Sequence, residues 1–211
     1  MTRKIWDISS AIRPGIPVWP GDTDYSESRT WELNDECPVN VSRFAMSTHT
    51  GAHADAPFHY DANGAAIADV PLDYYLGAVQ LFDVRDCDGP VLPAHFADHL
   101  QIGVSRVLFR TYDKAPVDQW DDRFKAIAPE TIEALAQRHV KLVGTDTPSL
   151  DPQTSKTMDA HHAVRRAQMA ILEGLVLDNV PAGVYELIAL PLKLANLDAA
   201  PVRAILRSIE D

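Results

Sequence analysis

Three of the eight histidines in this 211-residue chain fall in one stretch, His49-Thr50-Gly51-Ala52-His53-Ala54-Asp55-Ala56-Pro57-Phe58-His59, which also holds an aspartate. Imidazole nitrogens and carboxylate oxygens are the ligands that zinc and related divalent ions take in proteins. Scattered surface residues rarely reach this density. The stretch therefore predicts a metal site, and the rest of the fold must bring these side chains together.

The sequence restricts the local conformation of this stretch. A continuous strand would separate its first and last histidines by about 33 Å, whereas metal–ligand bonds measure about 2 Å. A helix would bring His49 and His53 onto one face but would aim Asp55 elsewhere, and Pro57 disfavours helical geometry just before it. We therefore expect a compact loop, for which Gly51 and the small alanines leave room.

A second group of possible ligands lies far along the chain, at His161 and Glu173. These residues would lie about 18 Å apart on a single helix. They could share an ion only if the helix ended and the chain returned as a strand ending near Glu173, which the composition of 168–172 allows. Taken alone, the pair reads more simply as a helix-face histidine and a strand-end carboxylate.

The hydrophobic pattern predicts a mixture of strands and helices in one domain spanning 1–211. Strands are expected at 5–8, 39–48, 78–84, 104–110, 141–145, 169–173, 185–190 and 202–206. Helices are expected at 93–100, 129–140 and 156–168. Because these elements do not alternate strictly, the pattern favours a mixed α/β fold over a doubly wound one.

Composition excludes several classes of protein. The net charge of −11 argues against unassisted binding to nucleic acid or to an anionic membrane surface. The two cysteines cannot form a disulfide framework. The chain starts without the apolar segment of a signal peptide, and it contains no long apolar run. We therefore expect a cytoplasmic protein that binds neither nucleic acid nor membranes.

The run 49–59 resembles the His-Thr-Gly-x-His-x-Asp-x-Pro-x-His signature of the cyclase family of metal-dependent hydrolases. Within this family the chain resembles the bacterial kynurenine formamidases over nearly its whole length, in the stretches 17–22, 144–152, 171–175, 185–194 and 201–207. The resemblance implies a mixed α/β fold with a swivelling β/β/α core. It also implies a homodimer in which loops help to close the partner's site.

The resemblance further implies two zinc ions per chain, for which manganese or cobalt could substitute. Three histidines and two carboxylates would hold the ions: His49, His53 and Asp55 the first, and Asp55, His161 and Glu173 the second. The Asp55 carboxylate would bridge them. His161 is preferred over its neighbour His162 because its offset of twelve residues from Glu173 is that of the family.

The activity implied is that of an arylformamidase, which hydrolyses N-formyl-L-kynurenine to L-kynurenine and formate in tryptophan degradation. A zinc-activated water would attack the formyl carbon. His59 would be the catalytic proton shuttle rather than a ligand, and Trp19 would contact the substrate. Two alternatives remain open: a related amide hydrolase such as an isatin hydrolase, and a non-catalytic metal-binding protein, which would need neither His59 nor Trp19.

Overall fold

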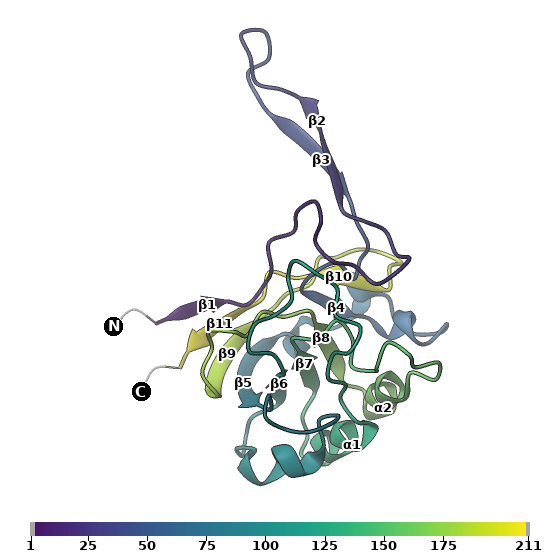
Figure 1. Cartoon of the computed structure of the whole chain (residues 1–211), viewed down its shortest axis with the longest axis vertical. Helices are drawn as coiled ribbons and strands as arrows, with labels where there is room; N and C mark the ends of the chain where they lie inside the picture. The colour runs from purple at the N-terminus through teal and green to yellow at the C-terminus, as the bar shows by residue number, and fades with distance from the viewer. Residues whose placement is uncertain (1–2, 210–211) are drawn as a thin grey trace.

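The computed structural model describes residues 3–209, and over this range a sheet of nine strands forms the centre of the molecule (Figure 1). Its order is β1-β11-β9-β5-β6-β7-β8-β4-β10. The strands are β1 (Ile5–Asp7), β4 (His53–Asp55), β5 (Leu76–Asp83), β6 (Arg106–Arg110), β7 (Leu142–Thr145), β8 (Ala170–Glu173), β9 (Gly183–Ile188), β10 (Ala199–Pro201) and β11 (Ile205–Ser208). Neighbours from β5 to β8 are parallel, and all other pairs are antiparallel.

Two hydrophobic cores lie on opposite faces of the parallel strands. Helices α1 (Pro129–Gln137) and α2 (Asp159–Ala167) pack together and cover one face, with Phe109 of β6 and Val143 of β7 beneath them. The neighbouring residues Leu108 and Leu142 point into the other core. Because both faces are covered, these strands are buried over nearly their whole length, as is typical of parallel sheets.

Five short 3-10 helices connect these elements within residues 3–209: η1 (Pro57–His59), η2 (Ile67–Asp69), η3 (Leu72–Tyr74), η4 (Pro93–His95) and η5 (Ala97–His99). No helix in this described range has the length and apolar composition needed to cross a membrane.

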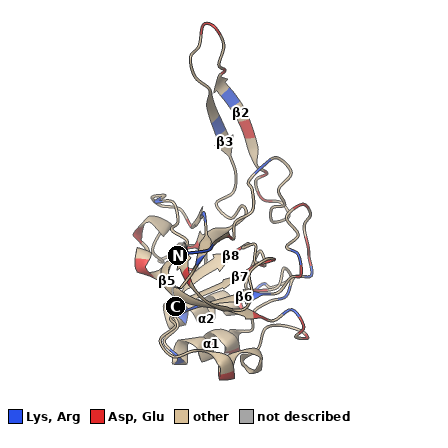
Figure 2. Cartoon of the chain, turned by 90° about the vertical axis from the view of Figure 1, so that its left-hand side faces the viewer, with Lys and Arg blue, Asp and Glu red and all other residues tan. Residues whose placement is uncertain are grey.

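A hairpin arm projects from the body of the molecule (Figures 1 and 2). It consists of β2 (Ser26–Trp31) and β3 (Val41–Ala45), which form a separate two-stranded sheet. Every residue of both strands is exposed. The arm therefore contributes nothing to the two cores.

The mixed α/β class predicted from the hydrophobic pattern is confirmed. The five predicted strands from 78–84 to 185–190 appear as β5 to β9, and the two longer predicted helices appear as α1 and α2. Strands β5 to β8 are largely buried, whereas β9 is half-buried. These predictions were correct because the pattern of apolar residues follows burial in the core.

Four of the predicted local conformations are wrong. The stretch 93–100 forms two 3-10 turns instead of one helix, since Phe96 adopts a φ of −149° between them. The strand expected at 39–48 is not half-buried but lies in the exposed arm, whose other strand, β2, has no apolar alternation. The strand expected at 202–206 begins only at Ile205, the first residue of β11, and the residues before it connect β11 to β10. The compact loop expected at 49–59 contains β4 and η1.

Gly174, directly after β8, permits a close backbone contact. Its φ is +64°, and a Cβ atom at this position would lie 2.3 Å from the carbonyl oxygen of Gly51. Glycine is required here for two reasons, the left-handed conformation and the absence of space. The contact fixes the end of β8 against the turn that precedes β4.

We expect Gly174→Ala to destabilise the protein by more than the cost of placing alanine in the left-handed conformation. Gly89 is a matched control, because its φ is +68° and nothing lies within 4 Å of its would-be Cβ. Gly89→Ala should cost about 1–2 kcal/mol, which lowers Tm by about 2–8 °C in a chain of this size. Gly174→Ala should lower Tm by at least roughly twice as much, because backbone must also move. Equal shifts in thermal unfolding would contradict the steric argument.

Candidate metal centre

Strand pairing brings the two distant groups of metal-ligand residues together. β4 and β8 are antiparallel neighbours in which His53 lies opposite Glu173. Helix α2 ends at Ala167, and the left-handed φ of 52° at the next residue, Gln168, reverses the chain into β8. The return from helix to strand that His161 and Glu173 require is therefore present.

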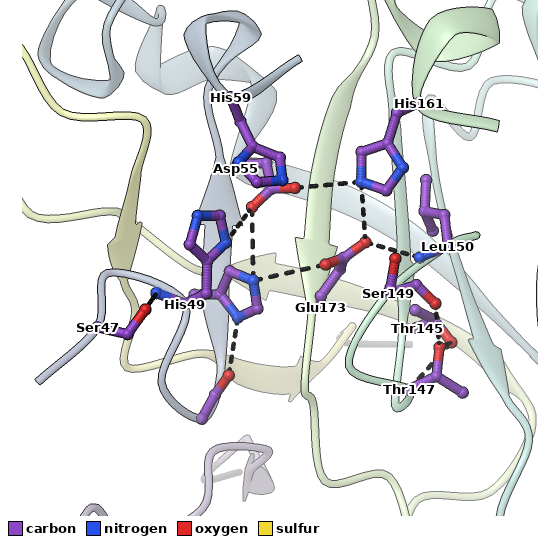
Figure 3. A network of polar contacts seen from close by, with 12 residues as sticks. Ser47, His49, Asp55, His59, Thr145, Thr147, Ser149, Leu150, His161 and Glu173 are labelled. Atoms are coloured by element: carbon purple, nitrogen blue, oxygen red, sulfur yellow. Dashed lines mark hydrogen bonds and ion pairs between the residues drawn. The ribbon is translucent and has the colours of Figure 1, made fainter. Parts of the chain in front are cut away.

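Five side chains converge at this point (Figure 3). Asp55 Oδ1 lies 3.1 Å from His49 Nδ1 and 3.4 Å from His53 Nε2. Asp55 Oδ2 lies 3.4 Å from His161 Nε2. The Glu173 carboxylate lies 3.5 Å from His53 Nε2 through Oε2 and 3.5 Å from His161 Nε2 through Oε1. The two oxygens of Asp55 thus face different imidazoles, as a bridging carboxylate would.

Each of the three imidazoles uses its outward nitrogen for a contact to a protein oxygen. The pairs are His49 Nε2 with Asp198 Oδ2 at 3.0 Å, His53 Nδ1 with Gly51 O at 2.9 Å, and His161 Nδ1 with Asp151 Oδ2 at 2.6 Å. Carbonyl and carboxylate oxygens only accept hydrogen bonds, so the outward nitrogens donate. In a neutral ring the inward nitrogen then carries a lone pair, the arrangement typical of histidines that bind metals.

The centre of the cluster lacks hydrogen-bond donors. His53 Nε2 and both oxygens of Asp55 are buried and have no hydrogen-bond partner among the described residues. Buried polar atoms without partners are rare, and a bound cation would satisfy these three atoms together. Ligand atoms around a tetrahedral zinc ion lie about 3.4 Å apart, and the contacts between nitrogen and oxygen here measure 3.1–3.5 Å. The residues therefore fit divalent cations.

The electrostatics of the cluster also favour positive charge. Burial opposes protonation of His53, but the nearby carboxylates of Asp55 and Glu173 outweigh it and raise the pKa of His53 to about 10. Burial likewise opposes protonation of His161, whose pKa rises to about 10 because Asp151 and Asp55 face its ring. Burial works against ionisation of Asp55, yet the imidazoles around it hold its pKa well below the usual range. The carboxylates thus attract cations to a cluster whose central side chains, Asp55, His53, His161 and Glu173, are buried.

The structure shows which of the neighbouring histidines 161 and 162 belongs to the cluster. The His161 side chain is 1% exposed and faces Asp55, whereas His162 is only partly buried. His59 lies beside the cluster, with its ring centroid 4.3 Å from that of His49 and 29% of its side chain exposed. Two sets of ligand atoms lie close enough to share an ion, one from His49, Asp55 and His59 and one from His53, Asp55 and Glu173.

An aromatic cavity of about 580 Å³ opens onto the cluster. Trp19 lines it and packs edge-to-face against Trp120 at 5.4 Å, while Trp120 donates a hydrogen bond to Gln153. Tyr112 and Met158 add to the walls. No lysine or arginine lines the cavity within residues 3–209. The cavity thus offers apolar and aromatic surface next to the cluster. Its described lining includes no lysine or arginine that could pair with a carboxylate of a bound molecule.

Three residues of this site were not identified from the sequence. Asp151 accepts hydrogen bonds from the backbone N–H groups of Ala160 and His161 and holds the His161 ring. Asp198 holds the His49 ring, and Trp120 contacts Trp19. Asp151 lies inside one of the stretches that carry the resemblance, which was the available signal. Asp198 lies between two such stretches, and Trp120 lies in none.

Comparisons with known proteins identify the family of this chain. Residues 6–152 match the family model Cyclase. A structure described as a potential metal-dependent hydrolase with cyclase activity is 30% identical, with a TM-score of 0.86 and full coverage of both chains. A predicted metal-dependent hydrolase from Bacillus stearothermophilus is also 30% identical, with a TM-score of 0.84 over 99% of this chain and 100% of that chain.

A third solved structure shares the fold at lower identity. Isatin hydrolase A from Labrenzia aggregata is 24% identical, with a TM-score of 0.85 over 99% of this chain and 94% of that chain. The family model ends before His161 and Glu173, whereas the structural matches extend over both. On the family model and the full-length structural match, this chain belongs to the cyclase family.

Proposed function

We propose that this chain is a metal-dependent hydrolase that cleaves N-formyl-L-kynurenine to L-kynurenine and formate. The observation that carries the proposal is the buried Asp55 carboxylate, which has no hydrogen-bond donor and faces imidazoles at the base of an aromatic cavity. The two relatives at 30% identity are described as metal-dependent hydrolases, which supports the reaction class. The choice of substrate rests on the resemblance to the kynurenine formamidases.

The proposed cofactor is a pair of zinc ions. His49, His53 and Asp55 would hold one ion, and Asp55, His161 and Glu173 would hold the other. When bound, such ions supply a nucleophile at neutral pH by acidifying water, and they polarise the carbonyl of the amide.

The protein's own residues bind the substrate and move protons. The edges and faces of Trp19 and Trp120 would contact the aryl ring of the substrate, and the apolar walls would exclude bulk water. His59, at the rim, would take a proton from the attacking water and deliver it to the aniline nitrogen. An aniline is a weak base, so this nitrogen needs a positioned proton when the tetrahedral intermediate collapses. The cavity recognises the aryl formamide end of the substrate rather than its carboxylate.

Metal content tests the proposed ligands. Mass spectrometry of the purified protein should find two divalent ions per chain in the wild type. Asp55→Asn should lower the affinity for both ions by more than about 100-fold. Loss of a bridging ligand should cost more affinity than the loss of a residue that only hydrogen-bonds to a ligand, which costs about 10–100-fold. Glu173→Gln should release one ion and keep the other. Asp69→Asn, at an exposed position outside the cluster, should retain both. Two ions retained in Asp55→Asn would contradict the bridge.

Turnover tests the substrate and the role of His59. The wild type should release formate from N-formyl-L-kynurenine, and a chelator should abolish the reaction. His59→Ala should keep its metal content but lose about 10²–10⁴-fold in kcat, the usual contribution of a positioned proton donor and acceptor.

Two outcomes would revise this scheme. Loss of an ion from His59→Ala would make His59 a ligand, as its grouping with His49 and Asp55 permits. Faster hydrolysis of isatin than of N-formyl-L-kynurenine would favour the isatin hydrolase alternative.

We also propose that the chain forms a homodimer through its hairpin arm. The two strands of the arm and the loop that connects them expose five large apolar side chains: Trp31, Leu33, Val39, Val41 and Phe44. An isolated two-stranded hairpin is marginally stable in water. The arm also carries both charge signs along its strands (Figure 2), so neither a uniformly positive nor a uniformly negative surface opposes its pairing with a second copy about a twofold axis.

Light scattering during size-exclusion chromatography tests the dimer. The wild type should have twice the mass of one chain, and Trp31→Ser combined with Phe44→Ser should shift it to the monomer at micromolar concentration. Ile102→Ser is a matched control, because Ile102 is 97% exposed on the body of the molecule and its loss should leave the mass unchanged. A monomeric wild type would refute the proposal.

A further inference from the structure

One carboxylate outside the metal cluster contacts two of its histidines. Asp198 Oδ2 lies 3.0 Å from His49 Nε2 and 3.5 Å from His59 Nδ1. Its other oxygen, Oδ1, accepts a hydrogen bond from Thr48 Oγ1 at 3.1 Å. The Asp198 side chain is 36% exposed, so it lies at the rim of the site rather than within the buried cluster.

The fold fixes the position of Asp198 through its backbone. Asp198 directly precedes β10, in which Ala199 lies opposite Asp55 of β4. The Asp198 carbonyl oxygen accepts a hydrogen bond from Ala56 N at 2.8 Å, and the Leu197 carbonyl oxygen accepts one from Ile67 N at 3.0 Å. The segment before β10 is thus attached on both sides of η1, the 3-10 helix that ends at His59.

The contact has a direction that matters for proton transfer. The separation of 3.5 Å is an ion-pair contact rather than a formed hydrogen bond. Because a carboxylate only accepts hydrogen bonds, a bond formed as the two groups approach would have His59 Nδ1 as its donor. The remaining nitrogen, Nε2, is then free of a proton in the neutral ring. Separations between a base and its orienting group are often long before substrate binds, and they shorten in the complex.

We propose that Asp198 is a positioning residue for His59: it accepts the Nδ1–H bond, selects the tautomer and leaves Nε2 as the nitrogen that exchanges protons with water and substrate. The role in turnover rests on the proposed hydrolase function, whereas the tautomer does not. Because the same oxygen also holds His49, Asp198 fixes the proton-transferring imidazole and a metal-ligand imidazole relative to each other.

Nitrogen NMR of the zinc-loaded, histidine-labelled protein tests the tautomer directly. The wild type should show the Nδ1–H form of His59, assigned by its loss in His59→Ala. Asp198→Asn should shift His59 toward the Nε2–H form. Asp69→Asn is a matched control, since Asp69 is exposed and lies outside the cluster, and it should leave the His59 signals unchanged. An Nε2–H tautomer in the wild type, or no change in Asp198→Asn, would overturn the proposal.

Kinetics with a double-mutant cycle test the role in turnover. At saturating zinc, with occupancy measured, Asp198→Asn should lower kcat by about 10²–10⁴-fold, with KM within about threefold, as expected when the orienting partner of a proton-transferring histidine is lost. In the His59→Ala background the same change should cost nothing further, because both substitutions remove one function.

The outcomes separate the two proposals. An equal loss from Asp198→Asn in both backgrounds would show that Asp198 acts through His49 and the metal site, and would overturn its role toward His59. A wild type that fails to hydrolyse N-formyl-L-kynurenine would refute the proposed function, and the tautomer measurement would still decide the assignment of Asp198.

Discussion

Asp55 is the charge around which this site is arranged. Removing a carboxylate from water costs several kcal/mol, and the strand that carries Asp55 is buried throughout. Three imidazoles face its two oxygens, and none supplies a well-formed hydrogen bond. The fold thus keeps two buried carboxylates, Asp55 and Glu173, in one cluster, which is stable when cations or protonated imidazoles balance their charge. This requirement explains why the neighbours of Asp55 are residues that bind either protons or metal ions.

The nature of the substrate is decided elsewhere, in the walls of the cavity. Several amide hydrolases could use the same cluster, and the chain shares its fold with an isatin hydrolase as well as with metal-dependent hydrolases of other description. Trp19 and Trp120 lie on separate loops that meet only in the folded protein. Divergence of such loops changes specificity without disturbing the strands that present the cluster.

The sequence was sufficient for the residue types of the site but not for its geometry. The density of histidines at 49–59 indicated a metal site, and the apolar periodicity of β6, β7 and α1 predicted the core. Pairing of β4 with β8 could not be predicted, because it depends on partners more than a hundred residues apart, and so the segment was expected to be a loop. Asp198 could not be identified from the sequence, because only the pairing of β10 with β4 places it beside the cluster. β10 has three residues and no hydrophobic pattern that would predict a strand. The burial predicted for 39–48 is wrong because its apolar residues alternate as in a half-buried strand, yet the strand they form lies in the exposed arm.

The position of β4 in the sheet has a consequence for biosynthesis. β4 comes from the first third of the chain, yet both of its neighbours, β8 and β10, come from the last. As the chain emerges from the ribosome, His53 and Asp55 must wait for most of translation before their partners exist. Such non-local pairing slows folding and leaves apolar strands exposed in the meantime. The nascent polypeptide therefore depends on remaining soluble until β8 and β10 are made, and a product terminated before β8 would lack Glu173 and the strand that pairs with β4.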